Sequence, residues 1–115
     1  MMKSYIYRLR QWLKGLFGYK PLYKTIVCED LPDKPLNNTL YLVGEQNSYW
    51  LGAMVCPCGC GDLIQLAMDP TGRPRWSVRL QKNGLATLHP SVHRKVRCRS
   101  HFFLRSGKIV WCEVN

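Results

Sequence analysis

Six cysteines occur in this chain, and three of them alternate within the segment Cys56-Pro57-Cys58-Gly59-Cys60-Gly61. A fourth follows much later in Cys98-Arg99-Ser100-His101, which also contains an imidazole. Thiolate and imidazole groups are the ligands that zinc prefers in closed, tetrahedral sites. The two segments therefore predict a structural zinc site assembled from separate parts of the chain.

The three clustered thiols cannot reach one ion from a regular strand. Alternate side chains of an extended strand lie about 7 Å apart, which is further than sulfur atoms around a single zinc. The backbone must therefore curl at the cluster. Gly59 and Gly61 permit the backbone angles that such a curl requires, and Pro57 fixes one of them. We expect a metal-binding knuckle here, although its spacing is not the commoner Cys-x-x-Cys.

Two ligand sets are compatible with the sequence. In the first, His101 stays free and all four thiols bind the metal: Cys56, Cys58, Cys60 and Cys98. In the second, His101 replaces one cluster thiol, since Cys98 and His101 have the three-residue offset that ligand pairs often use. Cys28 and Cys112 lie in apolar runs and are expected to be buried as small hydrophobic residues.

A metal is favoured over disulfides because the N-terminus does not have the features of a secretory signal. It lacks a long apolar stretch and a small-residue cleavage site. No apolar run reaches the roughly 18 residues that a transmembrane helix needs. Clustered thiols in a reducing cytosol are more often metal ligands than disulfides. We therefore expect a cytoplasmic protein without a transmembrane segment.

The elements that must position these residues are predicted to be short strands. Turn signals occur at Asp69-Pro70-Thr71-Gly72, Asn83-Gly84 and Ser106-Gly107. The β-like runs between turns and loops occupy residues 23–28, 39–43, 49–55, 62–68, 75–80, 85–88, 102–105 and 108–114. The cysteine cluster then forms the tip of a hairpin. The prediction is a small, mainly antiparallel β domain over residues 21–115 with a zinc knuckle.

An N-terminal extension, residues 1–20, precedes this domain. Residues 4–18 predict a basic amphipathic helix that begins near Ser4 and ends near Gly18. Its apolar positions follow helical spacing: Ile6, Leu9, Leu13, Leu16 and Phe17. Such a helix can lie on a membrane, dock on a partner or pack on its own domain.

The net charge is +10, and it is unevenly distributed. Residues 1–24 contain six Lys or Arg and no acid, and residues 70–112 contain ten and no acid. A field of this sign attracts nucleic acid, anionic lipid or an acidic protein. A nucleic-acid-binding zinc ribbon is therefore an alternative function, with four aromatic residues as stacking surfaces: Trp76, Phe102, Phe103 and Trp111.

The whole pattern resembles a family of small bacterial zinc-ribbon-like proteins whose genes often lie beside those of ubiquitin-like proteins and their activating and conjugating enzymes. The similarity rests on Cys-Pro-Cys-Gly-Cys-Gly-Asp at 56–62, Trp76, Leu88-His89-Pro90-Ser91, and the segments 98–104 and 107–111. It covers residues 38 to 112 and excludes the N-terminal helix. The resemblance implies a zinc-containing partner of the ubiquitin-like modifier and its enzymes. Such systems need a peptidase that processes the modifier or deconjugates it from targets.

A serine peptidase needs a hydroxyl, a base within hydrogen-bond reach and donors for the oxyanion. Ser100 and His101 are adjacent, but neighbours in an extended chain point to opposite sides, so that pair requires a turn. Ser91 could instead face His101 from another segment, provided that His101 is not a metal ligand. His89 is the second candidate base, and Asp62 could orient an imidazole.

Two other zinc chemistries are disfavoured by missing motifs. The sequence contains no His-Glu-x-x-His of a metallopeptidase and no zinc-deaminase ligand pattern. A non-catalytic adaptor, whose N-terminal helix docks on a partner, remains beside the peptidase and the nucleic-acid-binding ribbon. These three functions make different demands on Ser91, Ser100 and His101.

Overall fold

The computed structural model describes residues 22–72, 74–95 and 97–112. Every regular element in these ranges is a strand, which confirms the mainly β class. The predicted helix and the extension 1–20 lie outside the described residues. The strands are β1 (Lys24–Cys28), β2 (Thr39–Glu45), β3 (Ser48–Val55), β4 (Leu63–Ala67), β5 (Ser77–Leu80), β6 (Ala86–His89), β7 (Val92–His93), β8 (His101–Arg105) and β9 (Lys108–Trp111).

The first layer is a four-stranded sheet of order β1-β2-β3-β4. The pairs β2–β3 and β3–β4 are antiparallel hairpins, as their short connections predict. The β1–β2 pair is parallel, with Lys24 opposite Thr39. The loop 29–38 makes this possible because it returns the chain to the starting end of β1. The backbone N–H of Lys24 donates to Asn38 O at 3.2 Å, which seals that end.

The second layer consists of two sheets, β5–β6 and β7–β8–β9, which meet where β6 lies against β8. Val92 of β7 pairs with Phe102 of β8. Further along, Gly107 N–H donates to Ala86 O of β6 at 2.9 Å, so the chain of β8 continues antiparallel beside β6. The interruption falls at residues 90–91, between β6 and β7. The break in the strand therefore holds Ser91 in the middle of the layer.

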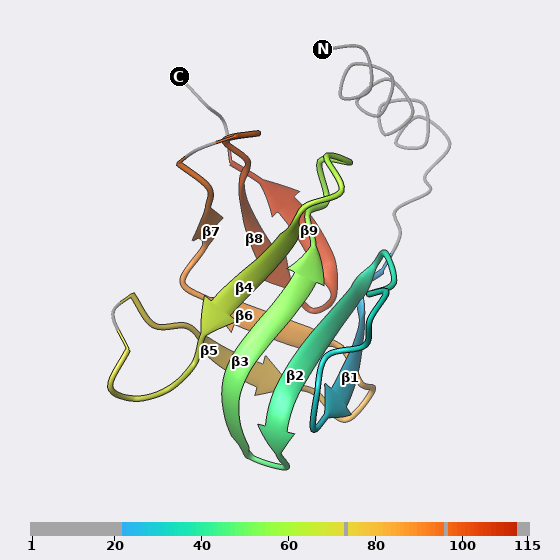
Figure 1. Cartoon of the computed structure of the whole chain (residues 1–115), viewed down its shortest axis with the longest axis vertical. Helices are drawn as coiled ribbons and strands as arrows, with labels where there is room; N and C mark the ends of the chain where they lie inside the picture. The colour runs from blue at the N-terminus through green and yellow to red at the C-terminus, as the bar shows by residue number, and fades with distance from the viewer. Residues whose placement is uncertain (1–21, 73, 96, 113–115) are drawn as a thin grey trace.

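The hydrophobic core lies between the two layers. Figure 1 shows β5, β6 and β8 behind the four-stranded sheet. Along β8, Phe102 and Leu104 are buried, while the alternate residues point to the other face, as the period of a strand requires. The core unites both layers through Leu40, Leu42, Met54, Ile64, Leu66, Ala86, Leu88, Val92, Phe102 and Leu104.

The predicted turns position the strands of the second layer. Gly84 has a φ of 83° in the β5–β6 connection, and Gly107 has a φ of 77° in the β8–β9 connection. A Cβ at Gly107 would also lie 3.1 Å from Tyr23 O and 2.8 Å from a Leu85 methyl carbon. Glycine is therefore required here both for its backbone angle and for the close approach of the two layers.

Two expectations need correction. Cys28 and Cys112 are half-buried rather than buried, because Cys28 ends the edge strand β1 and Cys112 follows the edge strand β9. The short strand β7 is not among the predicted runs, since two residues carry too little periodicity to be recognised.

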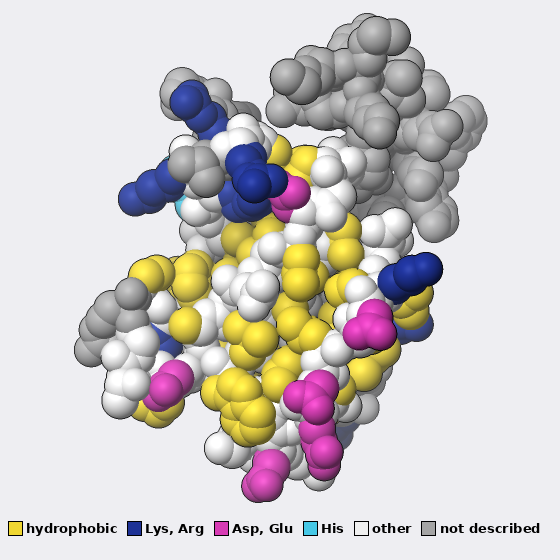
Figure 2. Space-filling model, viewed as in Figure 1, with side chains coloured by type: hydrophobic (Ala, Val, Ile, Leu, Met, Phe, Trp, Pro, Cys, Tyr) yellow, Lys and Arg dark blue, Asp and Glu magenta, His cyan; other side chains and the backbone are white. Residues whose placement is uncertain are grey.

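Charges are segregated on the surface. In Figure 2, hydrophobic side chains spread over the sheet formed by β2, β3 and β4, with acidic side chains at its lower end. Lys and Arg side chains gather at the upper left, toward the end of the molecule where β7 lies in Figure 1. None of the described segments forms a helix that is long and apolar enough to cross a membrane.

The core predicts a contrast between two neighbouring phenylalanines. Phe102 is fully buried and makes an edge contact with Trp111, whereas Phe103 is half-buried on the opposite face. Phe102→Ala should lower the free energy of unfolding by about 3–5 kcal/mol, because it leaves a cavity between the layers. Phe103→Ala should lower the free energy of unfolding clearly less. Urea unfolding measures both free energies, and equal losses would contradict this description of the core.

Candidate metal centre and serine–histidine pair

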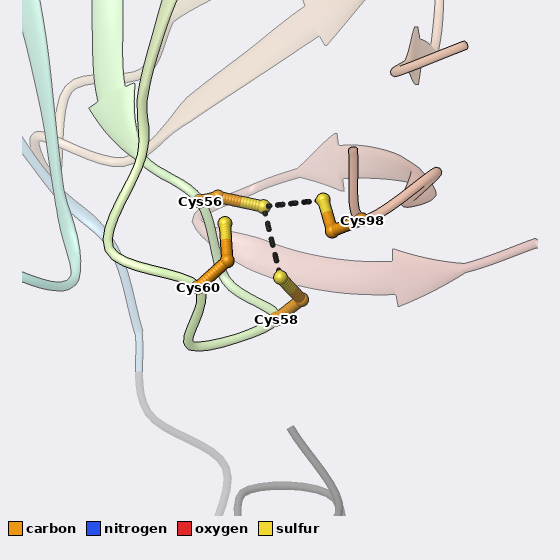
Figure 3. A group of neighbouring side chains, drawn as sticks. All are labelled: Cys56, Cys58, Cys60 and Cys98. Atoms are coloured by element: carbon orange, nitrogen blue, oxygen red, sulfur yellow. Dashed lines mark hydrogen bonds between the residues drawn. The ribbon is translucent and has the colours of Figure 1, made fainter. Parts of the chain in front are cut away.

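Four thiols converge at one end of the two layers (Figure 3). The Sγ atoms of Cys56, Cys58, Cys60 and Cys98 all lie within 4.8 Å of one another. Cys56 Sγ is 3.4 Å from Cys58 Sγ and 3.6 Å from Cys98 Sγ. A tetrahedral site with metal–sulfur bonds of about 2.3 Å places its sulfur atoms about 3.8 Å apart. The four thiols therefore have the spacing and chemistry to hold one metal ion.

The knuckle between β3 and β4 forms because the backbone curls as the sequence requires. Gly59 has a φ of 92° and Gly61 a φ of 84°. The N–H of Cys56 donates to Asp62 O at 2.8 Å, and the N–H of Gly59 donates to Cys56 O at 3.3 Å. These bonds close the turn and direct the alternating thiols to one side. The predicted knuckle geometry is confirmed.

Cys98 reaches the knuckle from the loop between β7 and β8. The loop is closed by Arg94 N–H, which donates to Ser100 O at 2.8 Å. Arg97 and Arg99, on either side of Cys98, have φ values of 63° and 53°. Such angles in non-glycine residues persist only where surrounding contacts hold them. The thiol cluster therefore ties the first layer to the β7–β8 loop of the second.

Protonation differs among the thiols. Burial raises the pKa of Cys56, Cys58 and Cys60. Burial also acts to raise the pKa of Cys98, but hydrogen bonds to the side chain and backbone of Ser100 outweigh it and lower that pKa to about 6. A metal that binds all four must displace protons from the other three, so its affinity should fall as the pH falls.

Arginine side chains surround the cluster. Arg94 Nη1 lies 3.5 Å from Cys60 Sγ and 3.4 Å from Cys98 Sγ, while its Nη2 donates to Asp62 at 3.1 Å. Arg97 donates to the same carboxylate at 3.2 Å. These hydrogen bonds lower the pKa of Asp62, that from Arg94 most. The partners of Asp62 are thus guanidinium groups rather than an imidazole, and the guanidinium charge offsets that of the thiolates.

His101 is directed away from the sulfur atoms and toward Ser91. Ser91 Oγ lies 2.9 Å from His101 Nε2, and both residues are half-buried. The indole N–H of Trp76 donates to Ser91 O at 3.2 Å and fixes the backbone of the serine. His93 pairs with His101 across β7 and β8. The two imidazole rings are stacked, with their centroids 4.2 Å apart and their planes at 14° to each other.

The remaining candidates have other surroundings. Ser100 is 7 % exposed, and its hydroxyl lies 3.1 Å from Cys98 Sγ and 3.7 Å from Cys56 Sγ. The His89 side chain is exposed, and its carbonyl accepts a hydrogen bond from Ser77 at 3.4 Å. Ser100 therefore belongs to the thiol cluster, whereas Ser91 is the serine whose hydroxyl contacts a histidine ring among the described residues.

The family model for "Bacterial ubiquitination-like system serine protease (BubE)" matches residues 27–112. The chain belongs to this family. No curated protein and no solved structure matches it. Membership in the BubE family makes the chain a component of a bacterial ubiquitination-like system, as the sequence resemblance implies, with partners from that pathway.

The family description names a serine protease, and Ser91 is in contact with a histidine ring. Ser91 and His101 are both candidates from the sequence alone, whereas the position of His93 beside His101 was not predicted. The signal was present, because Ser91 and His93 alternate along the chain and therefore share a face in an extended segment. Arg94 was also missed, since a single arginine in a basic stretch carries no local signal of its thiol contacts.

The cluster predicts that metal binding depends on Cys98. The protein should contain about one metal ion per chain, and Cys98→Ser should lose the metal and destabilise the fold. Cys112→Ser is the matched control, because Cys112 is half-buried and lies outside the cluster. Elemental analysis and urea unfolding measure the two effects. A metal-free wild-type protein, or equal metal content in both variants, would exclude the site.

Proposed function

We propose that this chain is the peptidase that processes the ubiquitin-like modifier of its system or removes it from targets, with Ser91 as nucleophile and His101 as general base. The observation that carries the proposal is the 2.9 Å contact between Ser91 Oγ and His101 Nε2. This distance is within the range for direct proton transfer between a nucleophile and its base. The family description supports the same reaction class.

The arrangement implies an acyl-transfer mechanism. With His101 protonated on Nδ1, its Nε2 accepts the Ser91 hydroxyl proton as Oγ attacks the carbonyl carbon of the scissile bond. The tetrahedral intermediate collapses when His101 returns that proton to the departing amine, which leaves an acyl-enzyme on Ser91. Water, deprotonated by the same imidazole, then hydrolyses the ester and restores the serine.

His93 supports the base in place of a carboxylate. Within the described ranges, no hydrogen bond joins His101 to an aspartate or glutamate. The parallel stack with His93 instead restricts rotation of the His101 ring and keeps Nε2 directed at Ser91. His93 is thus a positioning residue for the imidazolium that forms during catalysis.

The metal in this proposal is a structural zinc. Cys56, Cys58, Cys60 and Cys98 would hold the ion, and a site of four thiolates would leave no open position for water, as is typical of structural rather than catalytic zinc. Ser100, whose hydroxyl lies against Cys98 and Cys56, then serves the metal site and not the reaction. A zinc ion bound there would join the knuckle to the loop that precedes His101.

The proposed partners are the ubiquitin-like modifier and its activating and conjugating enzymes, within the cytoplasm. The domain covers residues 21–115, and the extension 1–20 provides an additional docking element. The nucleic-acid alternative loses one of its stacking residues, because Phe102 is fully buried in the core. The acid-free stretch of residues 70–112 suits an acidic protein surface equally well.

The mechanism predicts that two variants abolish cleavage without disturbing the fold. The substrate is the modifier carrying a C-terminal extension, and release of the extension is followed over time. Ser91→Ala and His101→Gln should each lower kcat by about 10³-fold or more, because nucleophile and base act as a unit. Metal content and thermal stability should stay close to wild type.

Ser100→Ala is the matched control, since Ser100 was an equal candidate in the sequence. It should retain kcat within a few-fold while changing metal affinity. Full cleavage by Ser91→Ala, or loss of cleavage only in Ser100→Ala, would refute the assigned nucleophile.

The stacked ring can be tested separately. His93→Phe keeps an aromatic face against His101 and should retain most of kcat, whereas His93→Ala removes the stack and should lower kcat about tenfold, with KM unchanged in both. Equal activity of His93→Ala and wild type would show that the stack does not support the base.

A further inference from the structure

A cavity of about 560 Å³ opens on the β5–β6 side of the second layer. Its lining is mainly polar and includes Ser77, Arg79, Gln81, Thr87, His89 and Ser106. None of these residues takes part in the proposed reaction, and no residue of the thiol cluster reaches it. A hollow of this size is large enough for several residues of an extended polypeptide.

The cavity lies close along the chain to the proposed nucleophile. His89 ends β6 and lines the cavity, and Ser91 follows two residues later in the interruption of the same layer. The Ser77 hydroxyl donates to His89 O at 3.4 Å, and the neighbouring Trp76 indole donates to Ser91 O at 3.2 Å. Trp76 and Ser77 therefore hold the backbone of Ser91 and of His89, the lining residue nearest to it in the chain.

Hydrogen bonds among Gln81, Thr87 and Ser106 hold another part of the cavity lining in place. Gln81 Nε2 donates to Ser106 Oγ at 2.9 Å, and Ser106 N–H donates to Thr87 Oγ1 at 2.9 Å. Both hydroxyl oxygens act as acceptors in these bonds, so their hydrogens remain to be donated to a ligand. Arg79 adds a guanidinium with up to five donors. The lining therefore offers mainly donors.

Charge points to the same kind of ligand. The lining residues span 77–106, and the chain contains no acid anywhere between residues 70 and 112. A donor-rich, positively charged cavity binds carboxylates and carbonyl oxygens and disfavours basic segments. An extended polypeptide presents carbonyl oxygens along its whole length, and acidic side chains would complete the match with Arg79.

We propose that this cavity is a substrate subsite that binds an extended, acidic segment of the modifier or its extension beside the scissile bond. The proposal rests on the proposed peptidase function and assigns its substrate preference. A carboxylate pairs with the Arg79 guanidinium, the hydroxyls of Thr87 and Ser106 donate to backbone carbonyls, and the segment leads from there to Ser91.

Arg79→Glu tests the subsite, with Lys82→Glu as the matched control. Both side chains are exposed in the β5–β6 hairpin and both substitutions change the net charge equally, but Lys82 does not line the cavity. With the extended modifier as substrate, Arg79→Glu should raise KM about tenfold or more, as expected for one charge-assisted hydrogen bond replaced by repulsion, while kcat changes little. Lys82→Glu should stay within about twofold of wild type in KM.

Binding without catalysis separates the two claims. In a Ser91→Ala background, the dissociation constant of the same modifier should rise about tenfold on adding Arg79→Glu and should not change on adding Lys82→Glu. Equal binding with and without Arg79→Glu, or equal effects of the two charge reversals, would overturn the subsite and leave the peptidase proposal intact. A wild-type protein that binds the modifier in an Arg79-dependent way but never cleaves it would refute the peptidase and retain the site as a binding surface.

Discussion

Four thiols converge from the two layers of the fold and bring the knuckle and the β7–β8 loop into contact. Cys56, Cys58 and Cys60 come from the knuckle between β3 and β4, while Cys98 comes from the loop between β7 and β8. Without a metal, burial raises the pKa of Cys56, Cys58 and Cys60, and the loop around Cys98 contains two non-glycine residues in left-handed conformations. A bound metal would hold that loop, and the loop closes the hairpin in which His101 lies opposite His93. A metal bound by the thiols would therefore also support the position of His101.

The thiol cluster and the Ser91–His101 pair are separate groups of side chains with different chemistry. Four sulfur atoms make up the candidate metal site, and the imidazole that sequence spacing allowed as a ligand contacts Ser91 instead. A site of four thiolates would suit a role in stability, whereas Ser91 and His101 are half-buried and contact each other. Arg94 connects the two sites, since its side chain contacts the thiols and it directly follows His93 in the chain. The positive field of the same stretch would bring an acidic partner to this face.

Local features of the chain could be predicted from the sequence, and features that join distant segments could not. The knuckle was predictable because glycine and proline between three thiols leave the backbone few alternatives. The hairpins at Gly84 and Gly107 follow from turn chemistry. The parallel β1–β2 pair and the alignment of β8 with β6 depend on tertiary packing, and no local signal encodes them. For the same reason the sequence left Ser91 and Ser100 as equal candidates, because only the fold decides which hydroxyl faces His101 and which faces Cys98.

We infer that a metal bound by the four thiols would hold the β7–β8 hairpin so that His101 activates Ser91. A fluorophosphonate, which reacts covalently with activated serines, tests this directly when the labelled residue is mapped by mass spectrometry. We expect an adduct on Ser91 in the metal-loaded protein, with labelling lost after chelation and in His101→Gln. An adduct on Ser100, no adduct on Ser91, or labelling of Ser91 that is unaffected by metal removal would contradict it.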